Sequence, residues 1–336
     1  MTSARTTLSF YRYLNVENPE TLMNELRAEW APLDVLGRIY VAFEGINAQL
    51  SVPSDNYVMF QRLVLSRFPE IPFKLALEDK DDAFTKLVIK VRPKIVADGL
   101  NDSAFDVTEV GRHLSAREFN EAMQDPNTIV VDLRNHYECE VGRFDNALMP
   151  SANTFREALP EMIEALSGQE DKKLLLYCTG GIRCEKASAY FKYKGFRDVN
   201  QLHGGIIDYA RQVQAEGLPT LYRGKNFVFD KRIAEAITED VLATCHQCEG
   251  AWDIHRNCRF EGCNRLFLQC PSCETEFEGC CSKTCQEIMQ KPKEERNFLQ
   301  QEWERKGGPK AYWSKTRLAA EYIRAKRPLD EPLPVH

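Results

Sequence analysis

The chain has 336 residues, a hydrophobic fraction of 43% and a formal net charge of −6 at pH 7. This length predicts two or three domains, and the acidic total excludes a protein that is basic over its whole surface, though not a local basic patch. The apolar runs are strand-sized, so we expect no membrane span. Because MTSARTTLSFYRYL has no apolar signal region, we expect an unexported, cytoplasmic protein.

Residues 1–100 alternate between strand and helix patterns. The predicted order is a strand at 8–14, a helix begun by Asn18 and Pro19, strands at 38–43 and 46–52, a helix from Ser54, and a strand at 87–91. Apolar residues repeat every second position in the strands and at helical spacing in the helices. This order predicts a ferredoxin-like α+β domain.

Residues 115–220 have buried strand patterns separated by helices. Ser115 and Glu118 form a capping box before the first helix. Strands are predicted in TIVVDLR, where the strand ends at Asp132, and at KLLLYC and DVNQLHGG, and a helix in TFREALPEMIEALSG is expected to be interrupted at Pro160. The pattern predicts an α/β domain with a parallel sheet and helices on both faces. Ligands bind at the carboxyl ends of such strands, where Asp132 and Cys178 lie.

The segment after KLLLY has the composition of a reactive loop. Cys178 is followed by Thr179, Gly180, Gly181, Ile182 and Arg183, and then by a helical pattern. Glycines allow the backbone N–H groups to turn inward as an anion-binding nest. That nest and Arg183 would stabilise a thiolate. A dithiol redox pair fits less well, because five residues rather than two separate Cys178 from Cys184.

Nine of the twelve cysteines lie between Cys245 and Cys285. Without an export signal, a metal site explains them better than disulfides. Two Cys-x2-Cys pairs supply four thiolates for one structural zinc ion, and an iron–sulfur cluster is the alternative. A second site would use Cys258, Cys263, Cys280 or Cys281, and Cys285. The predicted ligands in this Cys-rich zinc-binding module (221–290) are Cys245, Cys248, Cys258, Cys263, Cys270, Cys273, Cys281 and Cys285.

Residues 291–336 form a charged tail with a helical pattern. The tail contains many lysines and arginines, and Tyr312 and Trp313 offer rings for stacking on bases. A solvated amphipathic helix explains the same pattern, so the role of the tail stays open.

Three motifs resemble a rhodanese domain: VVDLRNHYECEVGRFDNA, YCTGGIRC and LHGGIIDY. The resemblance implies that Cys178 carries a persulfide and that Asp132 and Arg134 lie near the active site. A strand-end aspartate that caps local backbone, with a surface arginine, explains these two residues equally well. Cys184 would either resolve the persulfide or be a small buried residue. Related phosphatases use Cys-x5-Arg, whereas Cys-x4-Arg here fits sulfur better than phosphate.

The combination of FEGINAQ, YCTGGIRCEKA, GKNFVFD and the paired cysteines is similar to the bacterial rhodanese-like tRNA uridine hydroxylases. The resemblance covers roughly residues 5–290, and departs from the family pattern at Cys139 and at Met149-Pro150-Ser151. It implies that wobble uridine 34 of tRNA becomes 5-hydroxyuridine, with molecular oxygen and a reductant as co-substrates. The residues implied in catalysis are Cys178, Arg183, Asp132 and Cys184.

Oxygen activation without a metal or flavin needs another redox group. No flavin or NAD motif is present in the sequence, which leaves a persulfide or an oxidised Cys178 as the intermediate. Two alternatives stay open: a sulfurtransferase that passes persulfide sulfur to an acceptor, and a zinc-dependent RNA-binding protein without catalysis. Which tRNAs and which reductant are used, and the oligomeric state, do not follow from the sequence.

Overall fold

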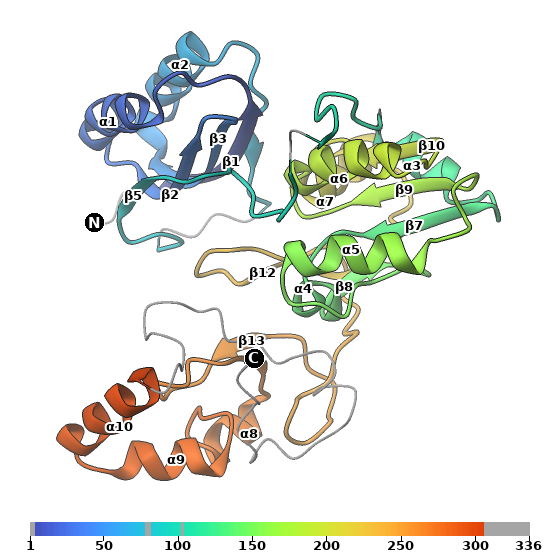
Figure 1. Cartoon of the computed structure of the whole chain (residues 1–336). Helices are drawn as coiled ribbons and strands as arrows, with labels where there is room; N and C mark the ends of the chain where they lie inside the picture. The colour runs from blue at the N-terminus through green and yellow to red at the C-terminus, as the bar shows by residue number, and fades with distance from the viewer. Residues whose placement is uncertain (1–3, 78–81, 102–103, 306–336) are drawn as a thin grey trace.

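The structure is a computed structural model that describes residues 4–77, 82–101 and 104–305. Figure 1 shows three parts: an N-terminal sheet with two helices, a central α/β domain, and a C-terminal region of short strands and helices. None of the helices in these ranges is long and apolar enough to cross a membrane.

The N-terminal part is a five-stranded sheet with the order β4-β1-β3-β2-β5. Helices α1 and α2 cover one face of this sheet (Figure 1), and Phe10, Trp30 and Phe60 pack between the two layers. The elements are β1 (Arg5–Tyr13), α1 (Pro19–Trp30), β2 (Leu36–Ala42), β3 (Gly45–Pro53), α2 (Tyr57–Arg67), β4 (Lys74–Leu75) and β5 (Leu87–Val91).

The predicted ferredoxin-like arrangement is present, but its last strand was misassigned. The strand that follows α2 in the pattern is β4, which pairs antiparallel with β1. The expected strand at 87–91 is β5, which pairs in parallel with β2 at the opposite edge. Strand β4 has only two residues, which is too short to show an alternating apolar pattern. The prediction therefore assigned the last strand to the longer apolar segment at 87–91.

The central part is a four-stranded parallel sheet with the order β6-β10-β9-β7. Helices α5 and α6 pack on one face, and α3 and α7 on the other, which confirms the predicted class. The elements are β6 (Arg112–Leu114), α3 (Ala116–Ala122), β7 (Thr128–Asp132), α4 (His136–Glu140), α5 (Phe155–Ala165), β9 (Lys173–Tyr177), α6 (Ile182–Tyr193), β10 (Asp198–Leu202) and α7 (Gly205–Glu216).

Pro160 does not interrupt its helix. Helix α5 continues through Pro160, and its N-cap Thr154 accepts a hydrogen bond from Glu157 N–H. Proline removes only one main-chain donor, and the buried apolar side of α5 stabilises the helix around it. The expectation of a break was therefore wrong.

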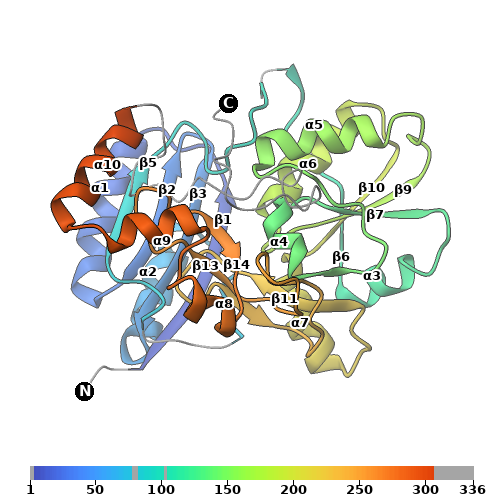
Figure 2. The ribbon, with the colours of Figure 1, turned by 90° about the horizontal axis from the view of Figure 1, so that it is seen from below.

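A small sheet of order β12-β11-β8 links the central part, through β8, to the cysteine-rich segment that follows. Figure 2 shows β13 and β14 beside helices α8 and α9. Residues 306–336, including Tyr312 and Trp313 of the predicted tail, lie outside the described residues. The elements are β8 (Gly142–Phe144), β11 (Tyr222–Phe227), β12 (Ala234–Ala236), β13 (His255–Asn257), β14 (Leu266–Leu268), α8 (Pro271–Glu276), α9 (Lys283–Gln290) and α10 (Lys293–Arg305).

Candidate functional site

The loop between β9 and α6 surrounds the sulfur of Cys178. Gly181, with φ of +91°, turns its N–H toward the sulfur and donates a hydrogen bond of 3.1 Å. Ile206 N–H, from the Gly-Gly-helix motif, donates to the Cys178 carbonyl at 3.0 Å. A side chain at Gly205, whose φ is +69°, would stand 2.5 Å from that carbonyl oxygen. Both glycine motifs therefore hold one loop around one sulfur.

The surroundings of Cys178 favour its thiolate. Burial by itself raises the pKa of this thiol, but the Cys184 thiol, the Arg183 charge and the N–H groups of Arg183 and Cys184 together lower it to about 5. Burial and the Cys178 thiolate raise the pKa of Cys184 well above its ordinary value. At neutral pH, Cys178 is therefore a thiolate and Cys184 a neutral thiol beside it.

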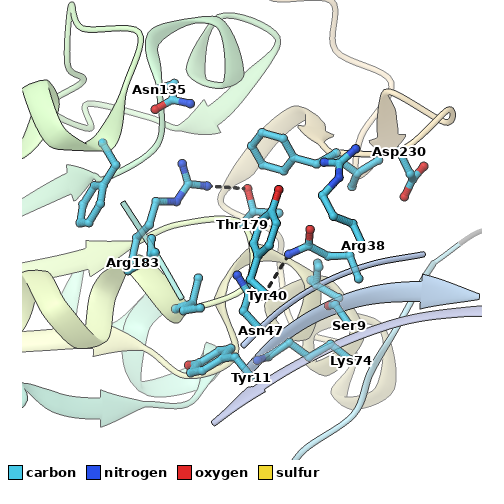
Figure 3. Close-up of a pocket in the computed structure, with 18 of the residues that line it drawn as sticks. Ser9, Tyr11, Arg38, Tyr40, Asn47, Lys74, Asn135, Thr179, Arg183 and Asp230 are labelled. Carbon is cyan, nitrogen blue, oxygen red and sulfur yellow. Dashed lines mark hydrogen bonds between the residues drawn. The ribbon is translucent and has the colours of Figure 1, made fainter. Parts of the chain in front are cut away.

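Glu138 holds Arg183 in place, and sequence reasoning did not assign this residue a role. Its carboxylate is fully buried and accepts two hydrogen bonds from the guanidinium of Arg183, at 2.7 and 2.8 Å. Arg183 also donates to the Thr179 hydroxyl at 3.2 Å (Figure 3). The sequence feature that could have pointed to Glu138 is a capping box: Glu138 is the third residue of a helix that Asn135 caps.

Asp132 and Arg134 form a second buried pair at the end of β7, the strand beside β9. The main-chain N–H and two guanidinium nitrogens of Arg134 donate to the carboxylate of Asp132, and the shortest contact is 2.5 Å. Arg134 also donates to the Gly142 carbonyl at 2.6 Å. The hydrogen bonds of Asp132 thus connect it to Arg134 rather than to Cys178, and its catalytic role stays a prediction.

A cavity of about 620 Å³ lies between the loop and the sheet face that helices leave uncovered. Strand alternation explains its lining: Phe10 and Ile39 point toward the helices, whereas Tyr11, Tyr40 and Asn47 point into the cavity (Figure 3). Thr179, Gly180, Ile182 and Arg183 line the opposite wall, while Cys178 itself is fully buried. This volume is typical of a small-molecule site.

Polar contacts join the two walls. The Tyr11 hydroxyl donates to Glu185 at 3.1 Å, and the Lys186 ammonium lies 2.7 Å from the carboxylate of Glu44. Arg211 donates to the carbonyls of Leu75 and Ala76. These contacts place the N-terminal sheet directly over the loop and the first turn of α6.

The sulfur atoms of eight cysteines form two groups of four. Within each group all sulfurs lie within 4.8 Å of one another. Cys280 belongs to neither group. His246, which follows Cys245 in the chain, pairs with Glu140 at 2.9 Å and is not part of either group. The groups are Cys245, Cys248, Cys270 and Cys273, and Cys258, Cys263, Cys281 and Cys285.

Family models match three segments of the chain. They are described as "UPF0176 acylphosphatase like domain" for residues 5–95, "Rhodanese-like domain" for 115–212 and "Rhodanase C-terminal" for 223–286. A protein of Leptospira interrogans named tRNA uridine(34) hydroxylase is 57% identical over 88% of this chain and 81% of its own length. The chain belongs to the family of tRNA uridine(34) hydroxylases.

Another hydroxylase of this family, from Pectobacterium carotovorum, is 49% identical over 89% of this chain and 85% of its own length. A solved rhodanese-like domain of an Anabaena protein is 17% identical, covering 34% of this chain and 80% of that one at a TM-score of 0.27. Membership of the hydroxylase family confirms the resemblance drawn from the motifs.

We expect the reactivity of Cys178 to show the effect of Arg183. Labelling by iodoacetamide, resolved at Cys178 by peptide mass spectrometry, should reach half its maximal rate near pH 5 and stay constant at higher pH. In Arg183→Ala the midpoint should rise by about 1–3 pH units, because a nearby cation favours the thiolate. Arg183→Lys should restore part of the shift.

Labelling through a rarely populated open state still has its midpoint at the pKa of the closed state, because the opening equilibrium is linked to the titration of Cys178. Arg197→Ala removes an exposed arginine that pairs with Asp171 and serves as the control. An Arg183→Ala midpoint equal to that of the wild type would contradict an electrostatic role of Arg183 at the thiolate.

Proposed function

We propose that this chain converts uridine 34 of tRNA to 5-hydroxyuridine with molecular oxygen. One oxygen atom enters C5 of the uracil, a reductant supplies two electrons and two protons, and the other oxygen atom leaves as water. The observation that carries the proposal is the complete Cys178 loop facing a nucleotide-sized cavity in a member of this hydroxylase family. A tRNA substrate places the reaction in the cytoplasm.

The cavity has the groups that bind an extruded nucleotide. Tyr11 and Tyr40 offer rings against which a base can stack. Gln49 donates to the Asn47 amide oxygen, and Asn47 donates to the Ile95 carbonyl, each at 3.1 Å. The amide oxygen of Gln49 can then accept from uracil N3–H. Arg38 and Arg156 are exposed at the cavity and can contact backbone phosphates. Uridine 34 lies in a single-stranded loop, so its extrusion costs little unpairing energy.

Sulfur supplies the redox centre of the proposed mechanism. The thiolate of Cys178 is the nucleophile: it attacks an oxidant to give a sulfenate, or the outer sulfur of a persulfide donor to give a persulfide and release the donor's thiol. The oxidised cysteine or persulfide then stands in the loop, with Arg183 and the Gly181 N–H beside it. Cys184 is close enough to share a hydrogen bond with Cys178, which makes it the candidate resolving thiol.

Nucleoside mass spectrometry of total tRNA tests this function. A strain that lacks the gene should lose 5-hydroxyuridine and its derivatives at position 34, and a plasmid copy should restore them. Growth of the restored strain under ¹⁸O₂ should add one heavy oxygen to each such nucleoside. Loss of thiolated nucleosides instead would indicate a sulfurtransferase, and unchanged tRNA would indicate an RNA-binding protein without catalysis.

Each four-cysteine group fits one structural zinc ion. A tetrahedral site with Zn–S bonds of about 2.3 Å has sulfur–sulfur edges of about 3.8 Å. The Cys248–Cys270 and Cys263–Cys281 sulfurs are 3.6 Å apart, and those of Cys281 and Cys285 3.8 Å. An iron–sulfur cluster spreads its thiolates over several irons, so this spacing favours a single ion. Four protein ligands leave no open position for catalysis.

We expect two zinc ions per chain by elemental analysis of the purified protein. Cys270→Ser should reduce the content to one and lower the melting temperature, because metal binding stabilises such small segments. Cys280→Ser is the matched control, since Cys280 is buried next to one group without belonging to it, and it should retain both ions. Iron in place of zinc, or an unchanged content in Cys270→Ser, would contradict these assignments.

A further inference from the structure

Lys74 is the one residue of the short edge strand β4 that reaches the cavity. The residue is only 3% exposed. Its methylene stem lies beside Gly180 of the Cys178 loop, where an added Cβ would stand 3.9 Å from the Lys74 Cδ. Arg211 of α7 binds the carbonyls of Leu75 and Ala76, which fixes β4 against the central domain. The lysine is thus held in a defined place.

The ammonium of Lys74 faces a ring and the cavity rather than a carboxylate. It lies 4.1 Å from the centre of the Tyr11 ring (Figure 3). Among the described residues no carboxylate forms an ion pair with it. Burial lowers the pKa of Lys74, and the more distant charges of Asp208, Cys178 and Glu185 only partly oppose this effect.

In contrast to Lys74, two arginines of the cavity with largely buried side chains are paired with carboxylates. Arg183 is bound by Glu138, and Arg232 by Asp230 and Glu235. Burying an ammonium without a paired anion lowers the stability of the folded protein. Its position on the wall of a cavity therefore points to an anionic ligand that pairs with it when bound. The ligand must bring a negatively charged or strongly accepting oxygen.

We propose that Lys74 is a substrate-binding residue that donates from Nζ to an anionic or carbonyl oxygen of the target nucleotide, opposite the Cys178 loop. This inference rests on the proposed function of the cavity. Two oxygens share the required chemistry: a backbone phosphate oxygen, and the uracil O4, on which negative charge accumulates when C5 becomes electron-rich. In either case the N-terminal domain supplies part of the site.

The stability of Lys74→Met tests this inference without any turnover. Methionine keeps the length of the side chain and removes the charge. If the lysine awaits a ligand, Lys74→Met should raise the melting temperature of the free protein, because it removes a buried charge that lacks a partner. Lys90→Met, an exposed lysine on β5, should leave it unchanged. A lowered melting temperature in Lys74→Met would show that the lysine serves the fold and would overturn the proposal.

Binding measurements then distinguish the two sources of oxygen. Uridine and uridine monophosphate are titrated against the wild type, Lys74→Met and Lys90→Met. A loss of at least tenfold for the monophosphate alone assigns the phosphate, and an equal loss for both ligands assigns the uracil oxygen. Unchanged binding of both would overturn the proposal.

A third measurement separates ligand binding from support of the thiolate. The labelling midpoint of Cys178 should stay within a few tenths of a pH unit in Lys74→Met. A shift as large as that of Arg183→Ala would show that Lys74 serves the sulfur instead of a ligand, which would also overturn the proposal. None of these three readouts requires hydroxylase activity, so a failure of the proposed function is detected separately.

Discussion

Cys178→Ser should abolish hydroxylation of uridine 34 and leave the fold intact. Serine keeps the size of the side chain and can accept the Gly181 hydrogen bond, but a hydroxyl forms neither a thiolate at neutral pH nor a persulfide. The thiol pKa of about 5 makes the native residue a thiolate under working conditions. We expect activity below one thousandth of the wild type, on the scale seen when a nucleophile is removed.

The measurement is 5-hydroxyuridine formed in the deletion strain that carries each variant, together with the melting temperature of each purified protein. Cys139→Ser is a matched control, because Cys139 is also buried in the central domain but its thiol donates to the Asn135 carbonyl rather than facing the loop. Retained activity in Cys178→Ser would show that Cys178 is not the reactive cysteine, and Cys184 would then be the first candidate.

Glu138→Ala should destabilise the protein by about 3–5 kcal/mol, the usual effect of breaking a buried ion pair from one side. Glu138 is fully buried, and its removal leaves the guanidinium of Arg183 without a carboxylate. The alanine also loses the bond from the Asn135 N–H, which caps α4. Urea unfolding of the wild type and the variant measures the difference in free energy of unfolding.

Two further variants show whether the loss arises from the unpaired charge. Glu138→Ala combined with Arg183→Met should recover a large part of the stability, since no buried charge then lacks a partner. Glu25→Gln breaks a partly exposed pair with Arg67 and should change the free energy of unfolding by less than about 1 kcal/mol. A Glu138→Ala variant as stable as Glu25→Gln would contradict the role assigned to this carboxylate.

Short-range patterns in the sequence predicted most of the elements near the site. The capping box at Ser115 and Glu118 is present, Tyr177 ends a buried parallel strand, and Gly181 opens the helix after Cys178. Each depends on residues close together in the chain, where steric limits and local hydrogen bonds act. The same holds for the Cys-x2-Cys pairs, whose spacing brings two sulfurs to one side of a turn.

Contacts between distant segments escaped sequence reasoning. Glu138 and Arg183 are 45 positions apart, and Lys74 meets the Cys178 loop across a boundary between domains. The strand that completes the ferredoxin-like order is two residues long, so only its pairing with β1 identifies it. The spacing of apolar residues along the chain does not predict such contacts, because burial and charge pairing depend on how distant segments pack together.

The sequence by itself determined the family, the reactive loop and the thiolate-rich segment, since each is encoded in a short run of residues with a local geometry. Only the tertiary structure decided what surrounds them. It paired Glu138 with Arg183, bound Asp132 to Arg134, and divided eight cysteines into two groups. It also made the bare face of the N-terminal sheet one wall of the cavity, because a sheet covered by helices on one face leaves its other side chains free to meet a second domain.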